Sequence, residues 1–271
     1  MKNISEMNII QIDITNSCTK KCSNCTRFCG HYIKDRIYFM DIDYFIAALT
    51  SLKDFDGIIG IIGGEPTLHP QFKDFCEIFK KLKPDKSKRG LWSNTCGNFN
   101  KYNDIIEDTF GYFNLNDHTR NIMHTPILVA SEDIIPNIEE RKKIIDSCWI
   151  QNYWSASINP NGAFFCEVAG MLSYLYDGIK GLDIIENPDW WKLSLSKYND
   201  QINWACDKCG GAIPLIPRRS IEELDDISIS SLTRLKNIKS PKIDNGLYTI
   251  YNKGIDYTQI RDVAWYWGYQ D

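Results

Sequence analysis

Short apolar runs alternate with amphipathic stretches over the first 147 residues. The apolar runs predict five buried strands, at 8–14, 57–62, 91–94, 111–115 and 127–130. Apolar residues at helical spacing predict helices after Asp41, at 68–82, at 100–107 and after Asn137. Such alternation is typical of a parallel α/β sheet, and the number of units is too low for a full eight-stranded barrel.

The pattern changes after Ser147. Residues 153–159 predict a strand, Asn159-Pro160-Asn161-Gly162 a turn, and residues 163–167 the returning strand of a hairpin. We therefore expect three parts, residues 1–147, 148–217 and 218–271. The last part ends in an aromatic run at 265–269 and either covers a site as a lid or packs on the rest of the chain; we favour packing.

Composition narrows the class of protein. Of the 271 residues, 43% are hydrophobic and 24% charged, as in ordinary globular proteins. The net charge of −4 gives no field that would hold nucleic acid, and the basic stretch 80–89 is interpreted as a solvated face. Because there is no signal-peptide pattern and the longest apolar run is too short for a membrane span, we expect a cytoplasmic, reduced protein whose ten cysteines are ligands or reactive thiols.

Three of these cysteines, Cys18, Cys22 and Cys25, stand close together just after the first predicted strand. Thiolates at such spacing hold iron–sulfur clusters, and three of them leave one iron of a four-iron cubane without a protein ligand. An open position on a metal is where chemistry takes place. The alternative is a zinc site, which usually has paired Cys-x2-Cys knuckles and four ligands.

The Cys-x3-Cys-x2-Cys spacing resembles the signature of the radical S-adenosylmethionine (SAM) superfamily. The motif Gly63-Gly64-Glu65-Pro66 is similar to the GGEP motif of that family, and Ser93, Asn94 and Asn116 resemble the polar strand ends that border its SAM site. The resemblance implies a partial (β/α) TIM-like barrel and a 4Fe-4S cluster whose open iron binds SAM. It also implies reductive cleavage of SAM to a 5′-deoxyadenosyl radical, with the electron supplied by a reductant such as flavodoxin or ferredoxin.

One position departs from the family. The residue before the third cysteine is commonly aromatic there and packs near the adenine of SAM, whereas here it is Asn24. We therefore expect Phe28 or backbone groups to hold the adenine.

Four further cysteines follow the predicted barrel: Cys148, Cys166, Cys206 and Cys209. With the Asn-Gly turn, a returning strand that carries Cys166, and a Trp-rich helix at 189–191, they resemble the SPASM/twitch auxiliary domains of radical SAM enzymes. Four cysteines are enough for one auxiliary 4Fe-4S cluster, so the shorter twitch form fits better. A four-cysteine zinc site remains open, since thiolates serve both metals.

The remaining chemistry lies in a few residues. We interpret Cys76 as a buried small hydrophobe, and Cys29 and Cys96 as packing residues or, less simply, as donors of a hydrogen atom to a substrate radical. The polar residues expected to reach a substrate are His118, Arg120 and Glu167. Each of these three is as compatible with a structural role.

These features favour an enzyme that oxidises or epimerises a small polar metabolite such as a sugar or an aminocyclitol. A cluster with four protein ligands next to the substrate would accept one electron and allow a net two-electron oxidation. A peptide maturase is the first alternative, and binding of a leader peptide would distinguish it. A non-enzymatic zinc or electron-carrier protein is the second, and it leaves GGEP without a purpose.

Overall fold

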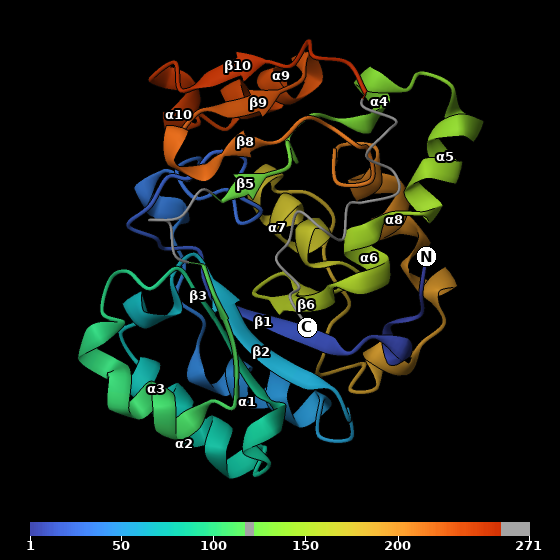
Figure 1. Cartoon of the computed structure of the whole chain (residues 1–271). Helices are drawn as coiled ribbons and strands as arrows, with labels where there is room; N and C mark the ends of the chain where they lie inside the picture. Colours follow the sequence, from blue (N-terminus) through green and yellow to red (C-terminus); the bar gives the residue numbers. More distant parts are fainter. Residues whose placement is uncertain (117–121, 256–271) are drawn as a thin grey trace.

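A six-stranded sheet forms the centre of the molecule (Figure 1). The computed structural model describes residues 1–116 and 122–255. The strands of the sheet are β1 (Ile9–Thr15), β2 (Ile58–Gly63), β3 (Arg89–Ser93), β4 (Tyr112–Leu115), β6 (Ser155–Asn159) and β7 (Gly162–Phe164). Their order is β4-β3-β2-β1-β6-β7, and all are parallel except β7, which returns antiparallel to β6. The mixed α/β class with a central parallel sheet is therefore confirmed.

Helices α1 (Ile42–Ser51), α2 (Phe72–Leu82) and α3 (Asn103–Thr109) connect the first four strands and cover one face of them (Figure 1). Asp41 caps α1 as predicted, because its side chain accepts hydrogen bonds from the amides of Asp43 and Tyr44. The aromatic residues of α2 are core residues, and the ring of Phe75 stacks on that of Phe45 at 4.3 Å. Core packing of this stripe is thus confirmed.

The helix α2 begins four residues later than predicted. Glu65 caps a short 3-10 turn, Pro66–Leu68, whose amides it partly satisfies. His69 precedes Pro70 and has an extended backbone, as residues before proline usually do. The chain can therefore enter the α-helix only after Pro70.

The strand predicted at 127–130 is wrong. These residues form a buried turn. The carbonyl oxygens of Ile127 and Leu128 accept hydrogen bonds from the amides of Gly210 and Ser228 instead of pairing in the sheet. A buried apolar run has the same appearance in sequence whether its backbone bonds to a strand or to a loop, and here β6 occupies the position beside β1.

The predicted hairpin at 153–167 forms, but its second strand is shorter than expected. Strand β7 ends at Phe164, and Cys166 is the N-cap residue of helix α7 (Glu167–Tyr176), which the pattern did not predict. Helix α7 is apolar and buried on nearly all sides, so it lacks the alternating pattern that indicates a surface helix. It lies over β6 and β7 on the side of the sheet opposite to α1 (Figure 1).

The other elements complete the shell around the sheet. The α-helices are α4 (Ser131–Ile134), α5 (Ile138–Asp146), α6 (Trp149–Tyr153), α8 (Asn199–Cys206), α9 (Ile229–Asn237) and α10 (Pro241–Asp244). The short strands are β5 (Met123–His124), β8 (Arg218–Arg219), β9 (Asp225–Ile227) and β10 (Tyr248–Ile250). The 3-10 turns are Ile4–Glu6, Lys34–Arg36, Pro66–Leu68, Lys86–Lys88, Asn100–Tyr102, Trp190–Lys192, Leu195–Tyr198 and Ser220–Glu222. Asn137 caps α5 as predicted, whereas the expected Trp-rich helix is only the 3-10 turn at 190–192.

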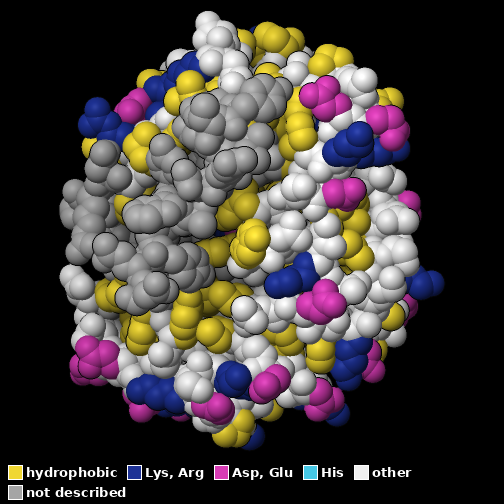
Figure 2. All heavy atoms as spheres, turned by 45° about the vertical axis from the view of Figure 1, so that its right-hand side comes forward, with side chains coloured by type: hydrophobic (Ala, Val, Ile, Leu, Met, Phe, Trp, Pro, Cys, Tyr) yellow, Lys and Arg dark blue, Asp and Glu magenta, His cyan; other side chains and the backbone are white. Residues whose placement is uncertain are grey.

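The elements β8, β9, α9, α10 and β10, within residues 218–250, form a separate C-terminal layer at the top of Figure 1. In it, β9 pairs with β10, and β8 pairs with β5 from earlier in the chain. Strands β6 and β7 follow residue 147 in sequence but belong to the same sheet as β1. The division of the chain into separate parts at residue 147 therefore stays a prediction. On the face drawn in Figure 2, lysine and arginine side chains are interspersed with aspartate and glutamate. Across residues 1–116 and 122–255, no helix is long and apolar enough to cross a membrane.

Candidate functional site

The loop that carries Cys18, Cys22 and Cys25 leaves the carboxyl end of β1 and is held by segments far away in sequence. At Ser23, the amide donates to the carbonyl oxygen of Ser220 at 2.9 Å, and the hydroxyl accepts from the amide of Leu224 at 3.0 Å. The carbonyl oxygen of Ser23 hydrogen-bonds Nδ1 of His124 at 2.7 Å. The C-terminal layer thus fixes the middle of the cysteine loop.

Asn24 is part of this attachment. Its backbone is left-handed, with φ of 51°, a conformation that Asn tolerates better than most residues. Its amide nitrogen Nδ2 donates to the carbonyl oxygen of His124 and to Asp226 at 3.2 Å, and its Oδ1 accepts from the amide of Asp226 at 2.9 Å. Asn24 therefore docks the C-terminal layer, at the position where the cysteine signature that this loop resembles commonly has an aromatic residue. Phe28 is buried, and its proposed contact with adenine stays a prediction.

A buried ion pair lies beneath the loop. The Asp225 carboxylate accepts from Nζ of Lys242 at 2.9 Å and hydrogen-bonds Nε2 of His31 at 2.6 Å. Lys242 also donates to the carbonyl oxygen of Cys22 at 3.1 Å. Burial alone would raise the pKa of Asp225, but the hydrogen bond from His31 and the charges of His31 and Lys242 outweigh it and lower that pKa.

The GGEP motif packs directly on the start of the cysteine loop. The amide of Gly64 donates to the carbonyl oxygen of Thr15 at 2.8 Å, and the amide of Glu65 to that of Ser17 at 2.7 Å. A Cβ atom on Gly63 would lie 2.1 Å from the Thr15 carbonyl oxygen, and one on Gly64 would lie 2.2 Å from that of Ser17. Only glycine allows the two backbones to approach so closely.

The Glu65 carboxylate is fully buried and binds neighbouring strand ends together. It accepts from the amide and hydroxyl of Thr67, from the Ser93 hydroxyl at 2.9 and 3.0 Å, and from the Asn94 amide at 3.0 Å. Burial raises the pKa of Glu65 against these hydrogen bonds. The amide of Asn116 in turn donates to the Ser93 carbonyl oxygen at 2.8 Å. The predicted SAM-binding residues are thus brought to one edge of the sheet.

The Cys18 sulfur is surrounded by donors. Nδ2 of Asn94 donates to it at 3.2 Å and the amide of Lys20 at 3.3 Å. The pKa of Cys18 is lowered, first by the neighbouring thiols of Cys29 and Cys96 and then by the amide of Lys20 and the side chain of Asn94, while burial acts against them. Cys29 and Cys96 therefore lie against the first cysteine set. Cys76 is buried in α2, which agrees with its interpretation as a small hydrophobe.

The second cysteine set surrounds a single pocket. Its residues are Met1, Ile145, Cys148, Ile150, Gln151, Phe165, Cys166, Val168, Ala169, Leu172, Ala205, Cys206, Cys209 and Ala212. The pocket encloses about 390 Å³ of free space, part of it open to solvent. Burial raises the pKa of all four thiols, that of Cys209 to about 12. The four cysteines predicted to act together are therefore brought together in an apolar environment.

Both sets have the chemistry of iron–sulfur ligands. One offers three thiols on a loop whose first sulfur already accepts amide hydrogen bonds, and the other offers four thiols around a pocket. Within the described part of the chain, no three His, Cys, Asp or Glu side chains converge as the ligands of a single metal ion do. A cubane binds each cysteine to a different iron, so its ligands stand further apart than those of one ion.

The expected catalytic residues are only partly described. His118 and Arg120 lie outside the described residues. Glu167 is buried at the start of α7, and its Oε2 accepts from Arg27 at 2.8 Å. Arg27 in turn lies 3.0 Å from Asp13. Sequence reasoning missed Asp13 and Arg27, although a carboxylate in the isoleucine-rich run 8–14 was a visible signal.

No protein-family model and no curated protein matches the chain. Among solved structures, BtrN in complex with AdoMet and 2-DOIA has a TM-score of 0.45 and 13% identity, over 74% of this chain and 88% of that one. BtrN with selenomethionine in an open conformation has a TM-score of 0.46 and 14% identity, over 77% of this chain and 90% of that one. Streptococcus suis SuiB bound to S-adenosylmethionine has a TM-score of 0.34 and 13% identity, over 92% of this chain and 51% of that one. The chain resembles BtrN.

Proposed function

We propose that this chain is a radical SAM enzyme that binds a 4Fe-4S cluster through Cys18, Cys22 and Cys25. When bound, the cluster and SAM supply a 5′-deoxyadenosyl radical that takes a hydrogen atom from a small polar substrate. The observation that carries the proposal is the contact between two motifs. The cysteine loop and the GGEP loop, more than forty residues apart in sequence, bond to each other through the amides of Gly64 and Glu65.

The residues around Cys18 prepare its sulfur as a ligand. The amide of Lys20 and the side chain of Asn94 donate to it, and such hydrogen bonds stabilise a thiolate and tune the potential of a cluster. Glu65 holds Ser93 and Asn94 in place rather than turning its carboxylate to solvent. In this proposal the edge formed by GGEP, Ser93, Asn94 and Asn116 binds SAM as part of a partial barrel.

The proposal extends to a second cluster, bound by Cys148, Cys166, Cys206 and Cys209 in a twitch-like part of the chain. Its support is the shared pocket and the cysteine spacing, which resembles that of 2-deoxy-scyllo-inosamine dehydrogenase. Such a cluster supplies an acceptor for one electron, so an alcohol that loses a hydrogen atom, an electron and a proton becomes a ketone. We therefore favour oxidation of a secondary alcohol in a sugar or aminocyclitol, with a flavodoxin or ferredoxin as reductant.

Anaerobic reconstitution with iron and sulfide, followed by counting of both and an assay for SAM cleavage, tests the proposal. Two cubanes give about eight irons, and the variant C18A/C22A/C25A retains about four and forms no 5′-deoxyadenosine. The variant C206A/C209A loses the other four, while Cys76→Ala serves as the control with both clusters. Failure of the reduced wild type to cleave SAM overturns the function, and zinc at the second set overturns only the electron acceptor.

A further inference from the structure

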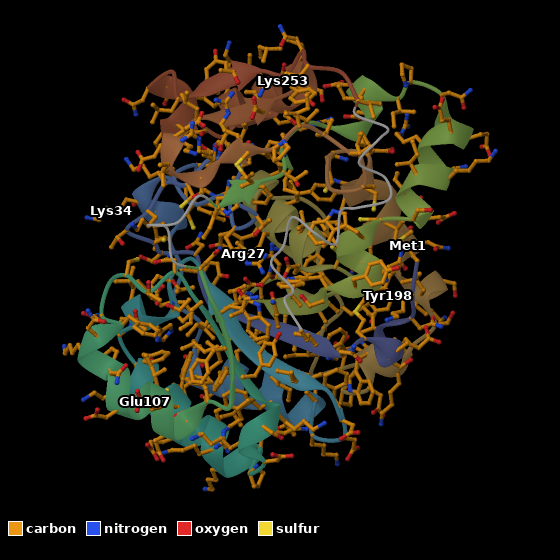
Figure 3. The ribbon with its side chains drawn as sticks, viewed as in Figure 1. Met1, Arg27, Lys34, Glu107, Tyr198 and Lys253 are labelled. Atoms are coloured by element: carbon orange, nitrogen blue, oxygen red, sulfur yellow. The ribbon has the colours of Figure 1, made fainter. Side chains whose placement is uncertain are left out.

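Three touching residues have buried polar atoms without hydrogen-bond partners. One of them, Arg27, is labelled near the middle of the molecule in Figure 3. These atoms are Nε2 of Gln11, both carboxylate oxygens of Asp13, and Nε and Nη1 of Arg27. Buried polar groups in native proteins are nearly always paired, so each orphan requires an explanation. Two of them, Nε of Arg27 and Oδ1 of Asp13, face each other as an ion pair, so three atoms on three neighbouring side chains are left without any partner and indicate a place where a polar ligand belongs.

The partners that these residues do have fix their positions. Nη2 of Arg27 donates to Oε1 of Gln11 at 2.7 Å and to Oε2 of Glu167 at 2.8 Å. Nε of Arg27 lies 3.0 Å from Oδ1 of Asp13, as an ion pair without hydrogen-bond geometry. The hydroxyl of Ser155 donates to Glu167 at 3.0 Å. Glu167 is therefore satisfied, whereas Asp13 is held beside Arg27 through Oδ1 with its Oδ2 unused.

The charges of this group do not balance. Two carboxylates, those of Asp13 and Glu167, share one guanidinium, that of Arg27. The side chains of Asp13, Glu167 and Arg27 are 0%, 5% and 4% exposed. The other titratable groups that face Asp13 are the phenols of Tyr32 and Tyr38, which bring no positive charge. Burial raises the pKa of Asp13 to about 7, although Arg27 acts against it. Above that pH, where Asp13 is ionised, a bound cation would complete the charge balance.

The group also has a suitable place in the fold. Gln11 pairs in register with Gly60 on one side and Ser157 on the other, so these residues share a face of the sheet. The indole of Trp92 lies over Gly60 on that same face, and its Nε1 lacks a partner as well. Along the chain, Arg27 follows Cys25 by two residues and Glu167 directly follows Cys166. The orphaned atoms thus lie on β1, which leads into the first cysteine set, and just after that set, and their neighbour Glu167 directly follows a cysteine of the second set.

We propose that Gln11, Asp13 and Arg27 bind an amino alcohol group of the substrate, with Asp13 accepting from its ammonium. Nη1 of Arg27 and Nε2 of Gln11 donate to the adjacent hydroxyl oxygen. A positive amine offsets the excess carboxylate charge, and a hydroxyl beside it uses the two orphaned donors. This inference rests on the proposed function for what happens to the substrate, but the binding site is argued from its own contacts.

Calorimetric titration of the anaerobically reconstituted protein at pH 8, with SAM saturating so that the open iron is occupied, tests the site. The probes are trans-2-aminocyclohexanol, which is protonated at this pH, and trans-cyclohexane-1,2-diol as its neutral match. The amine should bind at least about tenfold more tightly than the diol, as a hydrogen bond to a buried charge implies. Asp13→Asn should abolish that preference. Equal affinities, no binding of the amine, or an unchanged preference in Asp13→Asn would each overturn the proposal.

Urea unfolding without any probe provides a second, independent test. The pKa of Asp13 is higher in the folded than in the unfolded chain, so ionised Asp13 destabilises the folded state increasingly from about pH 4 to about pH 7. Asp13→Asn should therefore raise the urea midpoint at pH 8 and leave it unchanged near pH 4. A lower midpoint at pH 8 would show a structural ion pair and overturn the binding site. Neither test uses SAM cleavage, so failure of the proposed function is recognised separately.

Discussion

The two cysteine sets occupy opposite kinds of surroundings. The first lies on a polar loop where two amide groups donate to Cys18 and neighbouring thiols help to lower its pKa. The second lies around an apolar pocket where burial raises the pKa of every thiol. Hydrogen bonds and exposure are what set the potential of an iron–sulfur cluster. Under the proposed function, this difference suits the first set to a reactive, open cluster and the second to a closed one.

The two sets also differ in what holds them. The first loop depends on contacts with residues about 200 positions away, through Ser23, Asn24 and Lys242. The second set lies between residues 148 and 209, on α6, α7 and α8 and the turns beside them. Changes in the C-terminal layer should therefore affect the first set and spare the second.

The largest expected effect comes from Asp225→Ala. The substitution leaves Lys242 buried without its carboxylate and removes an acceptor of His31. Loss of one partner of a buried ion pair reduces the free energy of unfolding by about 3–5 kcal/mol. Urea unfolding measures this change, and iron counting should show that the first cluster is lost while about four irons remain on the second set.

The control for that variant is Asp108→Ala. Asp108 pairs with Lys80 at 2.6 Å, but its side chain is 67% exposed. A surface pair contributes about 0–1 kcal/mol, so this variant should keep its stability and both clusters. If Asp225→Ala and Asp108→Ala behave alike, or if Asp225→Ala empties the second set first, the proposed dependence of the first loop on the C-terminal layer is wrong.

The rates at which the thiols are alkylated provide a direct comparison of the two cysteine sets. In metal-free protein, Cys18 is already a thiolate near neutral pH, so its alkylation rate should change less than about twofold between pH 6 and 8. The thiol of Cys209 has its pKa raised to about 12, so its rate should rise about hundredfold over the same range. Both residues are partly exposed. Iodoacetamide labelling with peptide mass spectrometry provides the rates, and parallel pH profiles would contradict the contrast.

Gly64→Ala tests the contact between the GGEP loop and the cysteine loop. Its Cβ would lie 2.2 Å from the Ser17 carbonyl oxygen, and backbone must move to relieve the clash. Overpacking of this kind reduces stability by about 1–3 kcal/mol, and SAM binding should weaken with it. Gly246→Ala is the matched control, because nothing lies within 4 Å of that position and only its φ of +69° is unfavourable for alanine. It should leave SAM binding unchanged.

Much of this organisation was accessible from sequence. The strands before residue 116 and their helices follow from short apolar runs and helical spacing, because local pattern and final environment agree there. The cysteine loop and the GGEP motif were visible as motifs. The contact between them was not visible, since it depends on Gly63 and Gly64, where an added Cβ atom would lie 2.1 and 2.2 Å from a facing carbonyl oxygen.

The features that the sequence did not predict depend on burial and on contacts between residues distant in the chain. The turn at 127–130 and helix α7 are buried on all sides, so neither shows the alternation that distinguishes strand from helix. The partners of Asn24 and of Asp13 come from residues 226 and 27, which no local pattern connects to them. Tertiary contacts of this kind decide the roles of polar residues in the interior.

The smallest expected effect comes from Asn94→Ala, which removes one of the donors to Cys18. The side chain gives Cys18 a hydrogen bond of 3.2 Å, while the thiols of Cys29 and Cys96 remain in place. One such bond contributes about 1 kcal/mol, so the pKa of Cys18 should rise but stay below its ordinary value. Alkylation of Cys18 should then slow about threefold near pH 3, where the wild-type thiol is half ionised, and match the wild type at pH 8, whereas Cys209 is unaffected. Asn98→Ala, whose side chain donates to the Thr67 carbonyl oxygen, is the control. Equal slowing in both variants would mean that the loop has merely loosened, and that the donors around Cys18 do not set its charge.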